Sequence, residues 1–173
     1  MRNTLALPAL AAFLVSPALA EPKPLRSAPG IRAEAGVFCS AEGMGRKPAP
    51  GTAAGWVNSP SDEPEFSWPT LTVPARIGVA FGVKAESTGG DLSGATLVVE
   101  HPAYRDGTTV ESWSTNIHAG SPTVDFYSFD FDHELVPGPW RMQAQRDGRV
   151  LFDVTFDVVA PEESPEIVRL CAP

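Results

Sequence analysis

Hydrophobic and polar residues alternate over several short segments of this chain, which is the pattern of half-buried β-strands. The clearest segment is 150–158, where every second residue is Val or Phe and Asp153 and Asp157 lie on the other side. Asp147-Gly148, just before it, is a strong hairpin signal. The same alternation predicts strands over residues 31–39, 76–87, 95–99, 111–118, 124–131 and 140–144, and a last short strand over Glu166–Cys171.

Residues 40–75 interrupt this regular pattern. Six prolines and four glycines stand between Ser40 and Pro74. Because proline fixes φ and removes a backbone donor, we expect no long helix or central strand there, although a short strand over Glu65–Trp68 fits the composition. Long loops of this kind tend to be functional or disordered.

The aromatic segment 124–131 poses a question about its two faces. Phe126 has one parity, whereas Tyr127, Phe129 and Phe131 have the other. Either one of these aromatic residues is wrongly assigned to the buried face, or both faces of the strand are covered.

Strands of this length, separated by Gly/Pro turns, predict an all-β fold, because no segment keeps a helical hydrophobic period. We expect an immunoglobulin-like antiparallel β-sandwich of about seven to nine strands. A closed β-barrel is the main alternative.

The first 20 residues have the three parts of a secretory signal peptide. Arg2 supplies the positive charge, an apolar run follows from Leu5 to Val15, and Ala18-Leu19-Ala20 offers small residues for cleavage. We therefore expect cleavage near Ala20, a mature domain over residues 21–173 that begins with a loosely held proline-rich segment, and a periplasmic or secreted location. No later run approaches the roughly 18 apolar residues of a membrane helix, so we expect no transmembrane segment in the mature chain.

Charge and cysteine count narrow the function classes. The formal net charge of −8 disfavours nucleic-acid binding, because such a surface repels phosphate. Cys39 and Cys171 are the two cysteines, and in an exported chain they predict one structural disulfide. There is no C-x-x-C pair that would indicate redox activity.

The C-terminal half carries a set of motifs in a fixed order. It reads His101-Pro102, Tyr127-Ser128-Phe129-Asp130, Glu134-Leu135-Val136-Pro137-Gly138-Pro139-Trp140, Asp147-Gly148 and Phe156-Asp157-Val158. This resembles an uncharacterised bacterial family of exported domains of unknown function. The resemblance implies an immunoglobulin-like fold and export, and it implies no reaction and no catalytic residues. Independently of the family, Trp140 at a strand start is typical of a residue that packs across a sandwich core, with ligand stacking as the alternative.

Two groups of residues are candidates for binding. Asp130, Asp132 and Glu134, with His133 among them, have oxygen ligands at alternate positions and form a weak calcium candidate, against which stands the simpler interpretation of solvated loop charge. Trp56 and Trp68 lie in the Pro/Gly-rich loop, where they line a groove for a ligand or partner or else plug the end of the sandwich.

The sequence offers no catalytic motif. The three histidines form no metal-binding pair, and there is no G-x-S-x-G nucleophile elbow. We therefore expect an exported, non-catalytic binding or accessory module of the cell envelope without a cofactor, whose partner is an unknown envelope protein or small ligand. The alternatives are a small-ligand or calcium-binding periplasmic protein and a hydrolase with a dispersed active site.

Overall fold

The computed structural model describes residues 23–40, 44–60 and 64–171. The strands are β1 (Arg26–Ser27), β2 (Ile31–Cys39), β3 (Gly45–Pro48), β4 (Trp56–Ser59), β5 (Thr72–Pro74), β6 (Val79–Ser87), β7 (Leu92–Glu100), β8 (Val110–Ile117), β9 (Thr123–Ser128), β10 (Gly138–Arg146) and β11 (Arg149–Val159). The short helices are η1 (Asp132–Glu134), η2 (Pro161–Glu163) and α1 (Pro165–Leu170). The expected signal peptide lies outside the described residues.

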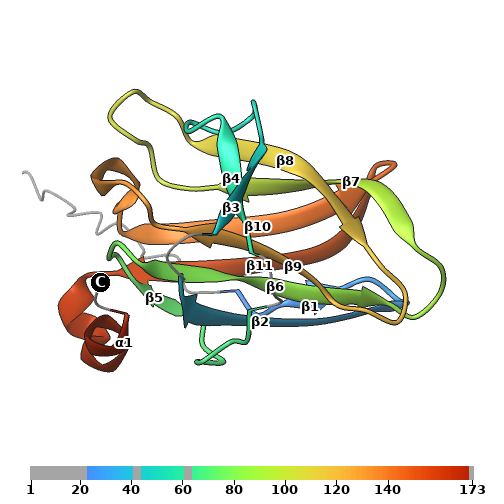
Figure 1. The fold of residues 1–173 in the computed structure, drawn as a ribbon, viewed down its shortest axis with the longest axis horizontal. Helices are drawn as coiled ribbons and strands as arrows, with labels where there is room; N and C mark the ends of the chain where they lie inside the picture. The colour runs from blue at the N-terminus through green and yellow to red at the C-terminus, as the bar shows by residue number, and fades with distance from the viewer. Residues whose placement is uncertain (1–22, 41–43, 61–63, 172–173) are drawn as a thin grey trace, which may run out of the picture.

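Seven long strands form two antiparallel sheets packed face to face (Figure 1). One sheet has the order β2-β6-β9, and the other has the order β11-β10-β7-β8. The chain crosses between the sheets after β6, β8 and β9, as in Greek-key sandwiches. The predicted immunoglobulin-like antiparallel sandwich is confirmed, and the closed barrel is excluded because the strands fall into separate sheets.

The core lies between these sheets and consists of the inward side chains that the alternation predicted. In β11 the inward residues Phe152, Val154, Phe156 and Val158 are almost fully buried. Trp140 is also fully buried, with its ring 5.8 Å from Phe81 and 5.5 Å from Phe129. The predicted hairpin joins β10 to β11, where Asp147 has φ 50° and Gly148 has φ 73°. Both positive values fit the two-residue turn that Asp-Gly favours.

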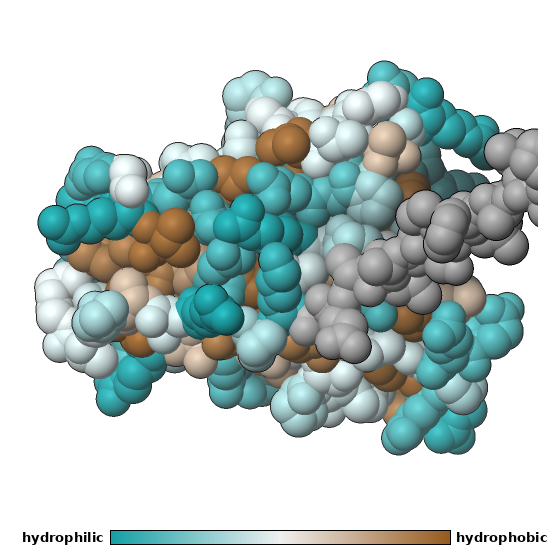
Figure 2. Space-filling view, turned by 180° about the vertical axis from the view of Figure 1, so that it is seen from behind, coloured by the Kyte–Doolittle hydropathy of each residue, from teal (hydrophilic) through white to brown (hydrophobic). Residues whose placement is uncertain are grey.

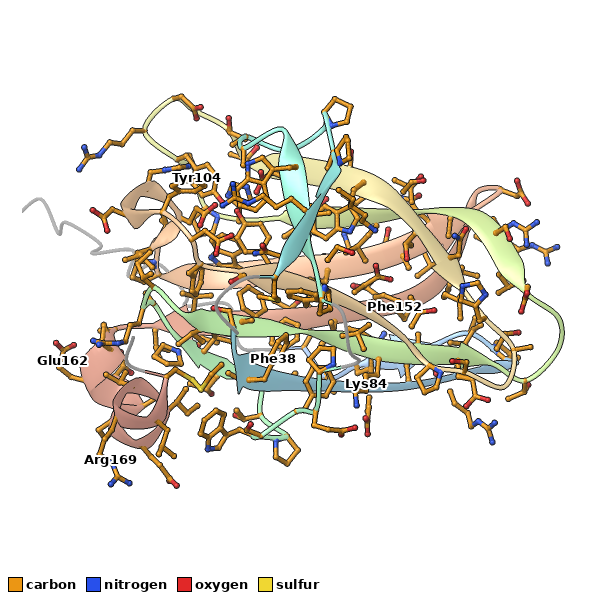
Figure 3. All side chains as sticks on the ribbon, viewed as in Figure 1. Phe38, Lys84, Tyr104, Phe152, Glu162 and Arg169 are labelled. Atoms are coloured by element: carbon orange, nitrogen blue, oxygen red, sulfur yellow. A yellow bond between two sulfur atoms is a disulfide. The ribbon has the colours of Figure 1, made fainter. Side chains whose placement is uncertain are left out.

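Both faces of the three-stranded sheet are covered, which answers the question posed by 124–131. Tyr127 and Phe129 face the main core, whereas Phe126 packs on the outer face with Phe38 and Ala80. Phe66 packs on this outer cluster and is itself partly buried. Figure 3 shows Phe38 and Lys84 on the same sheet. The proline-rich segment thus buries a second, smaller hydrophobic cluster.

Short strands protect the edges of the sandwich. β1 and β5 both lie along the outer edge of β11, and between them Thr155 and Asp157 donate backbone hydrogen bonds to Lys23 and Leu71. The segment expected to be a loose entry thus pairs with β11. Pairing of this kind removes open edges that would otherwise recruit other strands.

Two expectations for short segments need correction. Glu65–Trp68 is no strand, but Trp68 alone exchanges backbone hydrogen bonds with Val37 at 2.9 and 3.0 Å. The predicted strand over Glu166–Cys171 is the helix α1, because Pro165 at its first position favours a helical start and Ile167 then packs into the core.

The predicted disulfide between Cys39 and Cys171 is present, with a Cα–Cα distance of 5.0 Å. It joins the end of β2 to the end of α1. No helix in the described part of the chain is long and apolar enough to cross a membrane.

Candidate functional site

The β3–β4 hairpin crosses the open side of the sandwich, where β8 ends one sheet and β9 ends the other (Figure 1). On the β8 side, the Ser112 N–H donates to the Gly51 carbonyl at 2.9 Å. A Cβ at Gly51 would lie 2.5 Å from the Ser112 carbonyl oxygen, so only glycine allows this close approach. On the β9 side, the Asn58 amide donates to Asp130 at 2.8 Å.

Beneath the β8 attachment lies a buried carboxylate, Glu111, of which 2% is exposed. Its Oε1 accepts the Ala53 N–H of the hairpin connection at 2.6 Å. Its Oε2 lies 3.3 Å from the Tyr104 hydroxyl and 3.6 Å from His101 Nε2. The other ring nitrogen of His101 lies 2.9 Å from the Pro102 carbonyl oxygen and must donate to it, because a carbonyl only accepts.

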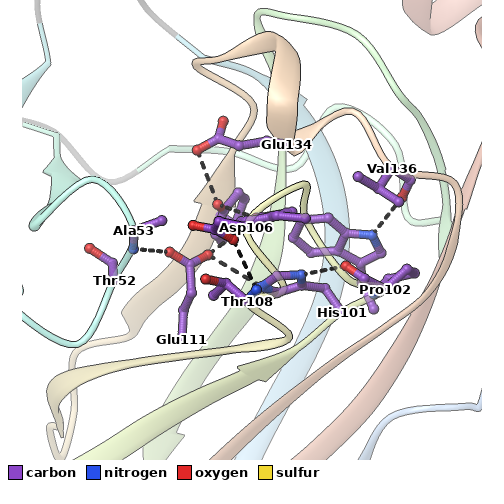
Figure 4. A network of polar contacts seen from close by, with 12 residues as sticks. Thr52, Ala53, His101, Pro102, Asp106, Thr108, Glu111, Glu134 and Val136 are labelled. Atoms are coloured by element: carbon purple, nitrogen blue, oxygen red, sulfur yellow. Dashed lines mark hydrogen bonds and ion pairs between the residues drawn. The ribbon is translucent and has the colours of Figure 1, made fainter.

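Beneath the β9 attachment lies a second buried carboxylate, Glu134 of η1. Its Oε2 accepts the backbone N–H groups of Asp130 and Phe131 at 2.7 and 2.9 Å. Its Oε1 lies 3.1 Å from the Tyr127 hydroxyl. The Tyr127 and Tyr104 hydroxyls are 2.8 Å apart, so one line of polar atoms joins Glu111 to Glu134 (Figure 4).

Aromatic rings hold this line in place. The His101 ring stacks on both Tyr104 and Trp140, at centroid distances of 4.0 and 4.7 Å. The Trp140 Nε1–H donates to the Val136 carbonyl oxygen at 3.0 Å. Trp140 therefore packs across the core, as its place in the sequence predicted.

Burial raises the pKa values of Glu134, Asp125 and the two tyrosines. Desolvation is the largest cause for Glu134, whose pKa rises to about 7, although the N–H groups of Phe131 and Asp130 oppose it. Burial likewise raises the pKa of Asp125 to about 6, against its hydrogen bond from Thr115. The pKa values of Tyr104 and Tyr127 are raised well above their usual range, mainly by burial. Folding therefore favours the protonated forms of these groups.

The space under the hairpin is small. A slot of about 30 Å³ lies between Trp56, Trp113, Tyr127 and Glu134. A volume of that size accommodates about two water molecules, so the closed hairpin leaves no room for an organic ligand there.

The outer side of the hairpin differs in charge from the rest of the protein. Residues 44–60 contain Arg46 and Lys47 and no acidic residue, in a chain with 21 Asp and Glu. The Arg46 guanidinium lies 3.7 Å from the centre of the Trp56 ring, and the Trp56 and Phe131 rings form a T-shaped pair at a centroid distance of 6.2 Å. Trp56 therefore supports a cation rather than offering an open stacking platform.

Comparison with protein families decides what kind of chain this is. The family described as "Domain of unknown function (DUF3859)" matches residues 31–158. The chain belongs to this family. The predicted resemblance is confirmed, and the match extends beyond the C-terminal half in which the motifs were found. No curated protein matches the sequence.

A solved structure of an immunoglobulin-like protein from Pseudomonas aeruginosa is similar to this DUF3859 domain. The sequences are 25% identical, and the match covers 82% of this chain and 99% of the other with a TM-score of 0.49.

The calcium candidate is not supported in this DUF3859 domain. Glu134 points inward and is used by Tyr127 and two backbone N–H groups, so it cannot join Asp130 and Asp132 at a surface ion. Within residues 23–40, 44–60 and 64–171, no three His, Cys, Asp or Glu side chains are grouped to hold a metal ion.

The two candidate tryptophans do not share a groove. Trp68 pairs with β2 and Trp56 lies on the hairpin beside β9, so the strand β6 separates their edges of the sheet. Trp68 is half-buried against the core, at the β2 edge of the sandwich.

The buried polar line was not predicted from the sequence. One signal was available in β8, where Glu111 has the same parity as Trp113, Thr115 and Ile117, all of which are buried. An acid on the inward parity indicates a buried charge. No local pattern indicated that Tyr104 and Tyr127 would connect it to Glu134, because that contact joins both sheets.

Proposed function

We propose that this DUF3859 domain is an exported, non-catalytic binding module of the cell envelope, and that its β3–β4 hairpin binds an acidic surface of an envelope protein. The contact area, which we call the hairpin surface, consists of Arg46, Lys47, Trp56, Val110 and Phe131. Export rests on the N-terminal sequence pattern alone.

The observation that carries the proposal is the gathering of exposed hydrophobic residues around a cationic hairpin. Val110, Phe131, Val150 and Leu170 are the exposed large hydrophobic residues of the described chain. Phe131 meets Trp56 of the hairpin, and Val110 directly precedes Glu111, the residue that holds the hairpin at Ala53. Aromatic and arginine side chains are enriched in protein interfaces and at their hot spots.

A second place with cations beside an exposed hydrophobic residue is the β10–β11 turn, with Arg146, Arg149 and Val150, which serves as the control below. Seen from behind, Figure 2 shows hydrophobic surface in separate patches with hydrophilic side chains between them. The hairpin surface instead combines both kinds of side chain with two positive charges. In an acidic protein such a site steers an acidic partner to one place, because opposite charges speed association and like charges repel elsewhere.

A charge-reversal experiment tests the proposal. The tagged exported protein is crosslinked in cells and recovered as wild type, as Arg46→Glu/Lys47→Glu, and as the matched control Arg146→Glu/Arg149→Glu beside the 147–148 turn. We expect the wild type and the control to recover the same acidic partner, with recovery that falls as salt rises. The hairpin variant should lose it while remaining folded, with the β-sheet circular dichroism spectrum of the wild type. Equal recovery by all three proteins would contradict the proposal.

Export is tested separately by the intact mass of the protein from the periplasmic or secreted fraction. We expect a mature chain that begins at Glu21. A chain that keeps residues 1–20 in the cytoplasmic fraction would contradict export and leave the hairpin proposal to its own test.

A further inference from the structure

The two attachments of the hairpin end in the same buried line of polar groups. Ala53 is held by Glu111. Asn58 is held by Asp130, whose backbone N–H is held in turn by Glu134. Because Tyr104 and Tyr127 connect the two glutamates, a change of protonation at either end reaches both attachments.

Counting protons shows what this line requires. Its contacts run from His101 Nε2 to Glu111, from Glu111 to Tyr104, from Tyr104 to Tyr127, and from Tyr127 to Glu134. Each phenol supplies one proton, so two of these four contacts have none when both carboxylates are ionised and the imidazole is neutral. With a proton on Glu134 Oε1, Glu134 donates to Tyr127, Tyr127 donates to Tyr104, and Tyr104 donates to Glu111. A second proton, on His101 Nε2, supplies the remaining contact, from His101 to Glu111.

We propose that protons shared along the line Glu111–Tyr104–Tyr127–Glu134 hold the β3–β4 hairpin against the sandwich, so that the hairpin opens more readily as pH rises. In the closed state both carboxylates are buried, and ionising them places a negative charge at each end of the two-tyrosine line in the core. Opening the hairpin hydrates them. Opening therefore releases protons, and linkage makes it more favourable at higher pH.

Most of the neighbouring charged groups act in the same direction or lie apart, whereas Asp125, when ionised, attracts Lys47 of the hairpin and opposes opening. His101 faces Glu111 and attracts it only when the imidazole is protonated, and His133 meets the Tyr104 ring edge at 5.3 Å. Asp130 raises the pKa of Glu134 by repulsion. Asp125 is buried, with Thr115 as its hydrogen-bond donor and Lys47 as the cation that lowers its pKa. Asp106 caps the Thr108 N–H outside the line.

If hairpin opening regulates partner binding, that role rests on the proposed function. The opening itself is a property of the isolated protein and is measured without a partner. Amide hydrogen exchange measures opening directly. Protection of the amides in residues 49–57, corrected for intrinsic exchange and compared with residues 141–145 of β10, should fall between about pH 5 and about pH 8. The fall should reach at most about tenfold per pH unit for each proton released.

Variants separate proton sharing from a merely structural role. Glu134→Gln supplies a permanent amide donor to Tyr127 and should reduce the pH slope while the hairpin stays protected. Tyr127→Phe breaks the line and should lower protection at acidic pH and flatten the slope. Glu100→Gln, which alters a surface carboxylate beside Arg141, should leave the slope unchanged. If Glu134→Gln fails to fold, the wild-type profile and Tyr127→Phe still decide the matter.

Two results would overturn the inference. One is wild-type protection of residues 49–57 that does not change with pH relative to β10. The other is a slope that is the same in the wild type, Glu134→Gln and Tyr127→Phe. Either result leaves the charge-reversal experiment untouched, because no partner is present in the exchange measurement.

Discussion

At the scale of single residues, small side chains decide where the proline-rich segment can lie. Gly36 of β2 has no side chain, and the Phe66 ring occupies the space above it. A Cβ at Gly36 would lie 2.7 Å from Phe66 Cγ and 2.8 Å from the Trp68 carbonyl oxygen. The outer hydrophobic cluster therefore depends on this glycine.

We predict that Gly36→Ala destabilises the protein by about 1–3 kcal/mol, the usual cost of overpacking. Gly90→Ala is the matched control, because a Cβ at Gly90 meets no atom within 4 Å. That variant should be neutral or slightly stabilising through its effect on the unfolded chain. Urea unfolding of both variants checks this, and equal midpoints would show that Phe66 does not rest on Gly36.

Inward and outward positions were predictable at this scale, because a strand alternates its side chains whatever its neighbours are. The inward parities of β2, β6, β7 and β11 follow directly from the sequence. The burial of the outer face of β9 was not predictable in this way, because the residue that covers it, Phe66, is far away in the chain. The polar line was hidden for the same reason.

At the scale of elements, the long strands and the Asp147-Gly148 hairpin were predictable from local pattern, and the short elements were not. The strands β3 and β4 have four residues each and pair with each other across a turn, and β5, with three residues, pairs with the distant β11. The segment Glu166–Cys171 contains the β-branched pair Ile167-Val168, which favours a strand, but Pro165 and the packing of Ile167 make it a helix.

The disulfide fixes this helix, and its removal should cost stability. It closes a loop between positions 132 residues apart. The chain-entropy model gives about 4–5 kcal/mol for such a loop, and measured values for native disulfides are about 2–5 kcal/mol. We predict that Cys39→Ala/Cys171→Ala lowers the free energy of unfolding, measured with urea, by about 2–5 kcal/mol. Wild type in reducing agent is the control and should fall by a similar amount; no change in either would contradict a structural role.

At the scale of the whole molecule, buried acids set the pH dependence of stability. The pKa values of Glu134 and Asp125 in the folded protein, about 7 and about 6, lie above their ordinary values of 4.5 and 3.8. Ionising them therefore costs folding free energy, and this cost disappears as pH falls toward the unfolded values.

We predict that the free energy of unfolding rises as pH falls from about 8 to about 5, by on the order of 2–4 kcal/mol. Below about pH 4 the trend should reverse, because Arg141 lowers the pKa of Asp153 and protonation breaks that pair. Urea unfolding across this pH range checks the curve. Glu134→Gln/Asp125→Asn should flatten its neutral part, and a wild type most stable above pH 8 would contradict the assignment.

The central claim is that the β3–β4 hairpin is the surface at which this domain meets its partner. The most direct measurement places a photo-crosslinking amino acid at Ser59 of β4 and, as the matched control, at Ser121 between β8 and β9. Both serines are exposed, and neither change alters charge. We predict that irradiation of living cells gives a discrete crosslinked product from position 59 and none from position 121. A product from position 121 alone, or none from either position, would contradict the claim.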